Sequence, residues 1–292
     1  METNAINRES RSERWRAYKR RPLSLLLRLA VTLSAAVTVF VLVTLVAYIL
    51  IKGIPNLKPS LFAWEYTTEN ASMLPAIINT LTMTVLSLLM AVPVGVCSAI
   101  YLVEYAGRGN RLVSLVRITA ETLQGIPSIV YGLFGFLFLV VACKFGYSLL
   151  SGAITLAIMI LPLILRTTEE ALKAVPDSFR EGSFGLGAGR LRTVFRIVLP
   201  SAVPGILAGV ILAIGRIVGE TAALIYTSGT VAGVPEMLMG CGRTLAVHMY
   251  ALLSNGLYTE QAYATAVVLL VMVVGINALS AWLAKKVSAK QR

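Results

Sequence analysis

Long uncharged runs constrain this 292-residue chain more than any other feature of its sequence. Residues 29–51 contain no charged side chain, and neither do residues 70–103. A helical crossing of the hydrocarbon core needs ~20 apolar residues, and only internal hydrogen bonds satisfy the backbone there. Charged residues make up 14% of the chain, whereas a soluble domain would carry about 25%. We therefore predict an all-α membrane protein.

Six segments are long and apolar enough to give the predicted crossings. They are residues 29–51, 70–103, 124–143, 147–165, 201–225 and 262–284. The first is longer than the ~7–15-residue core of a signal peptide, so we interpret it as a transmembrane helix. The predicted organisation is a basic arm (1–22), a six-helix transmembrane domain (23–285) with a polar loop at 166–200, and a short tail (286–292). A further interfacial helix is expected near 245–253.

The basic residues are distributed unevenly between the two sides of this topology. The arm, the 104–121 loop, the 166–200 loop and the tail hold nearly all of them, whereas the opposite side has Lys52, Lys58, Lys144 and Arg243. The positive-inside rule therefore predicts that both termini and the 166–200 loop are cytoplasmic. It also explains the net charge of +12 without a nucleic-acid partner.

Motifs for catalysis or for metal and nucleotide binding are missing from the sequence. It contains no HExxH, no GxxxxGK[ST] and no paired cysteine spacing, since its three cysteines are scattered. The single histidine, His248, has no acidic residue near it in the sequence. We expect no enzyme activity, metal or cofactor in this chain, so any use of ATP requires a separate subunit.

The polar loop at 166–200 predicts a short helix between two crossings. Pro176 interrupts any longer helix, and Ser178 with Glu181 has the spacing of a capping box. A glycine cluster around Gly187 ends the helix, and a second helix is expected over 191–199, before Pro200.

Three apolar side chains of this loop have no obvious packing partner within it. They are Phe179, Phe184 and Leu186. Two interpretations stay open on this pattern. The helix lies at the membrane interface, or it docks onto a cytoplasmic partner.

The fifth crossing contains the charged residues Arg216 and Glu220, each of which costs about 2.5–3.5 kcal/mol at mid-membrane. At i, i+4 spacing they lie on one helix face and could simply lock this helix to its neighbours. Arg before Glu is the less favourable order for a helical pair, which favours a functional role. Arg216 then offers a planar fork to an oxyanion, with Glu220 as counter-ion and Thr221 on a polar path. Arg166 is a weaker candidate, because an arginine at a membrane boundary commonly snorkels.

Glu181 to Pro200 resembles the EAA loop of bacterial ABC importer permeases, E-A-A-x3-G-x9-I-x-L-P. Glu181, Gly187, Ile197, Leu199 and Pro200 fall at the family spacing, whereas Gly182 and Ser183 replace the two alanines. Residues 126–135 (IPSIVYGLFG), 161–172 (LPLILRTTEEAL) and 215–222 (GRIVGETA) resemble phosphate importer permeases of the PstA type. The resemblance covers nearly all of residues 70–285.

The resemblance implies a type I ABC importer permease in the bacterial inner membrane. Its partners would be a PstC-like second permease, a PstB-like ATPase dimer and a PstS-like extracytoplasmic phosphate-binding protein. It also implies that the 166–200 loop forms a coupling helix seated in the ATPase, contacted through Ser178, Phe179, Glu181, Phe184, Leu186 and Gly187. The alternatives are a sulfate or molybdate permease, an ATP-independent transporter or channel, and a non-transporting scaffold or sensor.

Overall fold

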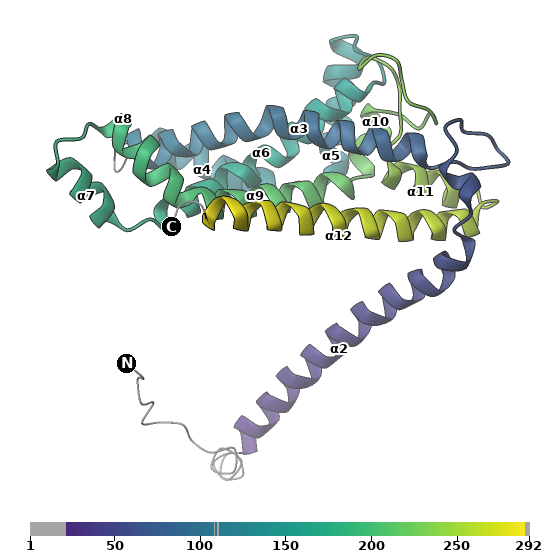
Figure 1. The fold of residues 1–292 in the computed structure, drawn as a ribbon, viewed down its shortest axis with the longest axis horizontal. Helices are drawn as coiled ribbons and strands as arrows, with labels where there is room; N and C mark the ends of the chain where they lie inside the picture. The colour runs from purple at the N-terminus through teal and green to yellow at the C-terminus, as the bar shows by residue number, and fades with distance from the viewer. Residues whose placement is uncertain (1–21, 108, 110, 290–292) are drawn as a thin grey trace. The chain divides into compact units, whose positions relative to one another are not determined.

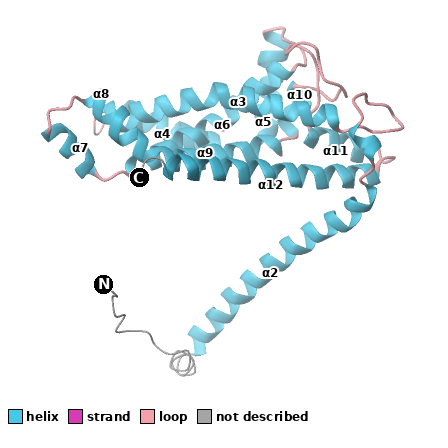
Figure 2. Ribbon diagram, in the orientation of Figure 1, coloured by secondary structure: helices cyan, strands magenta, loops and turns pink. Residues whose placement is uncertain are grey.

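The computed structural model describes residues 22–107, 109 and 111–289, and every regular element in these ranges is helical (Figures 1 and 2). The predicted basic arm, apart from Pro22, lies outside the described residues. The α-helices are α2 (Pro22–Gly53), α3 (Leu74–Ile100), α4 (Arg111–Gln124), α5 (Ser128–Gly135), α6 (Leu149–Lys173), α7 (Asp177–Gly185), α8 (Arg190–Thr193), α9 (Leu199–Val218), α10 (Ala222–Thr227), α11 (Leu245–Ser254) and α12 (Thr259–Ala289). Two 3-10 turns, η1 (Ile54–Asn56) and η2 (Pro59–Phe62), and three π-helical segments, η3 (Tyr101–Tyr105), η4 (Phe136–Ala142) and η5 (Val194–Val198), complete the elements.

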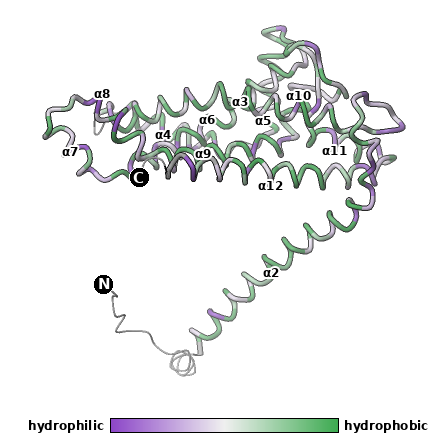
Figure 3. The backbone as a smooth tube through the Cα atoms, viewed as in Figure 1, coloured by the Kyte–Doolittle hydropathy of each residue, from purple (hydrophilic) through white to green (hydrophobic). Residues whose placement is uncertain are grey.

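The chain divides into two units, residues 1–51 and 52–292. The first unit contains most of α2, whose 32 residues are apolar along nearly their whole length (Figure 3). The most apolar stretch of this helix buries none of its residues within the chain. A helix that is apolar on every face is stable only among lipids or in a protein core. This agrees with the first predicted crossing.

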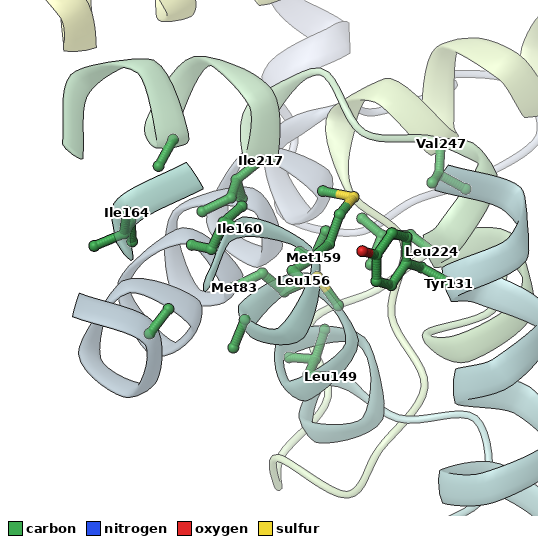
Figure 4. Packing of buried hydrophobic residues seen from close by; sticks show 13 residues of the cluster. Met83, Tyr131, Leu149, Leu156, Met159, Ile160, Ile164, Ile217, Leu224 and Val247 are labelled. Atoms are coloured by element: carbon green, nitrogen blue, oxygen red, sulfur yellow. The ribbon is translucent and has the colours of Figure 1, made fainter. Parts of the chain in front are cut away.

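The second unit is a bundle in which α3 packs on α6, α6 on α9, and α9 on α12. The centre of its core lies where Met83 of α3 meets Leu156, Met159 and Ile160 of α6 and Ile217 of α9 (Figure 4). All five side chains are almost fully buried. Because α6 is the element that α3, α4 and α9 all contact, it is the central helix of the bundle.

Five helices are long and apolar enough to cross a membrane, and a bent pair supplies a sixth candidate span. That pair is α4 followed by α5 and η4, with a bend of 102°. The predicted crossing at 124–143 therefore starts later, at Ser128, because Gly125 and Pro127 break the helix. The stretch predicted as the loop 104–121 contains most of the helix α4, so that part of the prediction was wrong.

Two other helix boundaries differ from the prediction. Pro200 does not separate two helices, since α8, η5 and α9 run continuously from Arg190 to Val218. The π-helical turn before the proline shifts the hydrogen-bond register, so the missing N–H is tolerated. At the C-terminus, residues 286–289 of the predicted tail continue α12. Residues 290–292 lie outside the described part.

Small residues allow close helix contacts in the bundle. A Cβ added to Gly209 would lie 2.7 Å from Thr167 Cβ, and one added to Gly205 would lie 2.6 Å from Ala171 Cβ. This glycine pair of α9 therefore packs against α6, as its four-residue spacing predicts. A Cβ at Gly132 of α5 would lie 2.7 Å from the Cα of Ala223 in α10.

Gly132→Ala should destabilise the protein, because the new methyl group meets backbone atoms that cannot rotate away. We expect a loss of about 1–3 kcal/mol, as for other overpacked sites, seen as a lower melting temperature in detergent. Gly275→Ala is the matched control, since a Cβ there meets nothing within 4 Å. Equal melting temperatures for the two variants would contradict the close α5–α10 contact.

Candidate functional site

Arg216 lies in the last turn of α9 and is half-buried. Its charge acts on the phenol of Tyr131 in α5, and the Tyr131 hydroxyl donates a hydrogen bond of 2.8 Å to the Leu123 carbonyl. Among the described residues Arg216 forms no ion pair. A permanently charged guanidinium without a carboxylate is therefore available inside the bundle.

Glu220 does not share a helix face with Arg216, so the predicted i, i+4 arrangement was wrong. The helix ends at Val218, and α10 begins only at Ala222. Buried Glu220 lies in the break, where its Oε1 accepts a hydrogen bond of 3.1 Å from the Ala223 N–H. The carboxylate thus satisfies one of the backbone donors that every helix start leaves free.

The hydroxyl groups near this break, with the predicted Thr221 among them, are engaged in local bonds. Thr221 Oγ1 donates to the Gly219 carbonyl at 3.4 Å, and Thr227 Oγ1 donates to the Ala223 carbonyl at 2.9 Å. Ser228 Oγ donates to the Gly242 carbonyl. Thr221 is half-buried, and its hydrogen bond of 3.4 Å is longer than that of Thr227. Its hydroxyl is therefore the one most easily turned toward another partner.

Helix α7 presents the side chains predicted to contact a partner. Ser178, Phe179, Glu181, Phe184, Leu186 and Gly187 are all exposed, and Leu186 is 91% exposed. The helix begins at Asp177, with Pro176 at the N-cap, so Ser178 lies inside it and the predicted capping box is not formed. Gly187 has a φ of +81°, which lets the chain reverse direction after the helix.

A buried hydroxyl pair holds α7 against α8. Ser183, at the second alanine position of the EAA pattern, is buried, and its Oγ lies 2.8 Å from Thr193 Oγ1. The departure from alanine is therefore matched by a hydrogen-bonding partner.

Arg180 anchors α7 to the end of α3. Its Nη2 lies 2.7 Å from Glu104 Oε1 in η3 and also donates to the Leu172 carbonyl at 2.9 Å. Nη1 donates to the Val175 carbonyl at 2.8 Å and to the exposed Asp177 carboxylate at 3.2 Å. Sequence reasoning missed this pair, although Glu104 ends an uncharged run and so signals a group that needs a partner. Both residues line an open groove of about 1060 Å³ between η3, α4 and α7.

Further ion pairs fasten α4 to α6. Buried Glu169 lies 2.6 Å from Arg117 and 2.6 Å from Lys173. Arg166 pairs with Glu170 at 3.1 Å and with Glu121 at 3.6 Å, so this candidate residue is already engaged at an exposed surface.

His248 is fully buried at the start of α11. Burial lowers its pKa to about 3, and the positive charge of Arg243 acts in the same direction. The Ala71 backbone lies beside the ring and opposes the shift, although neither ring nitrogen has a well-formed hydrogen bond. The imidazole is therefore neutral at physiological pH.

Acidification below pH 6.5 should destabilise the protein through His248. The unfolded chain binds a proton near pH 6.5 and the folded chain only near pH 3, so folding stability is complete above pH 6.5 and falls as the pH drops. The expected loss is about 1.4 kcal/mol per pH unit. Melting temperatures from pH 7.5 to 5 should fall more steeply for the wild type than for His248→Gln. Parallel curves would refute this assignment.

Comparison with known proteins places this geometry in a family. Residues 91–291 match the family model described as binding-protein-dependent transport system inner membrane component. The chain is 31% identical to the probable ABC transporter permease protein YqgI of Bacillus subtilis, covering 88% of this chain and 94% of the relative. It is 37% identical to the phosphate transport system permease protein PstA of Yersinia pestis, covering 78% and 77%.

A solved structure has the same fold. The crystal structure of a bacterial alginate ABC transporter in complex with its alginate-bound periplasmic protein matches with a TM-score of 0.68. The match covers 94% of this chain and 98% of that one, at 16% identity, which supports the fold alone. With its apolar helices and a family match over most of its length, the chain is a multi-pass protein of the bacterial inner membrane. It belongs to the family of binding-protein-dependent transport system inner membrane components, the permease subunits of ABC importers.

Proposed function

We propose that this chain is a permease subunit of an ATP-driven inorganic phosphate importer and forms half of its translocation pathway. Its likeness to PstA supports the substrate, and the unpaired guanidinium of Arg216 inside the bundle is the observation that carries the proposal. The chain binds no cofactor. A separate ATPase dimer hydrolyses ATP, a second permease completes the pathway, and an extracytoplasmic binding protein delivers phosphate.

Arg216 binds the oxyanion in this mechanism. A guanidinium donates two parallel hydrogen bonds to phosphate, and it does so at least cost when no carboxylate competes. Glu220 keeps the break between α9 and α10 in place, so that Arg216 stays at the end of α9, and its negative charge nearby keeps binding weak enough for release. The Thr221 hydroxyl exchanges its long bond to Gly219 for a phosphate oxygen.

Arg166 is a secondary phosphate contact. Its two carboxylate partners are more than half exposed, and exposed ion pairs contribute only ~0.2–1 kcal/mol. Phosphate can therefore displace them.

Helix α7 is the coupling helix, and the ATPase binds its exposed face. The apolar side chains of Phe179, Phe184 and Leu186 lose water on docking. Movement of α7 then reaches α3 through Arg180 and Glu104. This role puts α7 and both termini in the cytoplasm, in line with the excess of basic residues on that side.

Arg216→Gln should lower ATP-dependent phosphate uptake into proteoliposomes at least 100-fold, because it removes the charge that faces phosphate. The complex should still assemble with its ATPase. Lys58→Gln, which removes an exposed cation, should retain uptake and serves as the control. Full uptake by Arg216→Gln would overturn the site.

The same assay tests the substrate. Wild-type uptake should resist competition by sulfate and molybdate and should require ATP. Uptake of sulfate or molybdate, or phosphate movement without ATP, would favour the other importer or the channel. A complex that moves none of these ions would favour a scaffold or sensor.

Glu104→Gln should uncouple ATP hydrolysis from transport. Removing one partner of a buried pair costs about 3–5 kcal/mol, which frees α7 from α3 while its outer face still binds the ATPase. We expect ATPase activity to persist and phosphate uptake per ATP to fall at least fivefold. Asp177→Asn removes the exposed partner of the same Arg180 and should leave the ratio unchanged. Equal ratios for both variants would refute this coupling route.

A further inference from the structure

Buried polar atoms without a hydrogen-bond partner are concentrated at one place in the bundle. In the described residues they include Asn79 Oδ1, Arg243 Nε and Nη2, Thr244 Oγ1, and both ring nitrogens of His248. The four residues are neighbours, since Asn79 Nδ2 donates to the Arg243 carbonyl at 3.2 Å, Thr244 follows Arg243, and the Tyr66 ring contacts both the Arg243 guanidinium and the His248 ring. Each unsatisfied buried group destabilises the fold, and native proteins contain few of them. Their concentration points to an absent polar ligand.

Arg243 is the charged member of this cluster. Arg243 is only 7% exposed, and it forms no ion pair within the described part of the chain. Two contacts compensate it, a 3.4 Å bond from Nη1 to the Thr230 carbonyl and the ring of Tyr66, 4.6 Å from the guanidinium carbon. A cation–π contact offsets only part of the cost of burying an ion. The charge is therefore left largely uncompensated.

The surrounding groups suit an oxyanion. Thr244 is the N-cap of the ten-residue helix α11, yet its hydroxyl does not cap the helix and is free to donate. The neutral His248 ring carries one N–H, beside the Ala71 backbone, and one acceptor nitrogen. The positive charge of the site therefore comes from Arg243. The helix N-terminus adds a favourable potential for an anion.

Asn79 supplies a hydrogen-bond acceptor beside these donors. Its Nδ2 donates to the carbonyls of Gly233 at 2.8 Å and Arg243 at 3.2 Å, which fixes the amide so that Oδ1 is the unpartnered atom. Hydrogen phosphate carries an O–H that can donate to this oxygen, whereas sulfate carries none at neutral pH. A site that expects a hydroxyl donor rejects an analogue without one.

We propose that Arg243, Thr244, His248 and Asn79 form a second oxyanion site, selective for an anion that bears a hydroxyl group, hydrogen phosphate. This rests on the proposed function and deepens it. Helix α11 lies at the opposite end of the bundle from α7 (Figure 1), so phosphate reaches this site before Arg216. Arg243 Nε and Nη2 are covered by the chain in this structure, so the proposal requires this end of the bundle to open before phosphate binds.

The binding test uses the purified importer without its binding protein and measures the rise in melting temperature caused by inorganic phosphate. An Arg216→Gln background removes the first site. There we expect phosphate, but not sulfate, to raise the melting temperature. Adding Arg243→Gln should abolish this rise, whereas adding Lys58→Gln should keep it. Thr244→Val, which leaves the Arg243 charge in place, should weaken the rise and tests the site even if the Arg243 variant does not assemble.

Uptake separates failure of the second site from failure of the proposed function. Wild-type importer that moves no phosphate refutes the proposed function. The second site alone is refuted if the wild type takes up phosphate and the Arg243→Gln and Thr244→Val variants match it. Both their uptake and their stabilisation by phosphate would then be unchanged. A lower melting temperature with an unaltered phosphate effect would show that these groups bind only water, which also overturns the proposal. Support requires at least a tenfold fall in uptake by Arg243→Gln.

Discussion

The need to satisfy every backbone polar group without water governs this structure. In the hydrocarbon core an unpaired N–H or C=O costs several kcal/mol, so a helix can break only where the protein itself supplies partners. The break after α9 meets this condition, since the Glu220 carboxylate accepts the Ala223 N–H. Before Pro200 the helix has a π-helical turn. In a regular α-helix the proline ring would clash with the carbonyl one turn earlier, and its missing N–H would leave that carbonyl unpaired.

At the end of the bundle that carries α7, ion pairs join the helices in addition to apolar packing. Glu169 holds α4 on α6 through Arg117, and Glu104 holds α7 on η3 through Arg180. Both carboxylates are largely buried, and such pairs break at high cost when one partner is removed. In the proposed mechanism these pairs determine which helix moves with α7 when the ATPase acts on it.

The sequence predicted the class of fold and most of its long helices, because uncharged runs have few solutions other than spanning helices. It also placed the exposed face of α7, through the glycine cluster and the EAA spacing. It failed where a contact joins distant residues or where a helix breaks. The Arg180–Glu104 pair spans 76 positions, and i, i+4 counting assumed that α9 continues past Val218. Hydrophobic periodicity and motif spacing describe neighbours along the chain, whereas a long-range ion pair and a helix break depend on tertiary contacts.

In the proposed transport cycle, Arg216 and Arg243 are the phosphate-binding cations, and the proposal explains why the chain does not neutralise them. An ion pair within the chain would stabilise the resting protein, but phosphate would then have to displace a tethered carboxylate at high effective concentration. Leaving the guanidinium short of partners raises the energy of the empty state and so favours the loaded one. The closely packed core around α6 stabilises the fold that holds these arginines. In this proposal the carboxylates pair where helices are held together, and the unpaired arginines lie where phosphate binds and leaves.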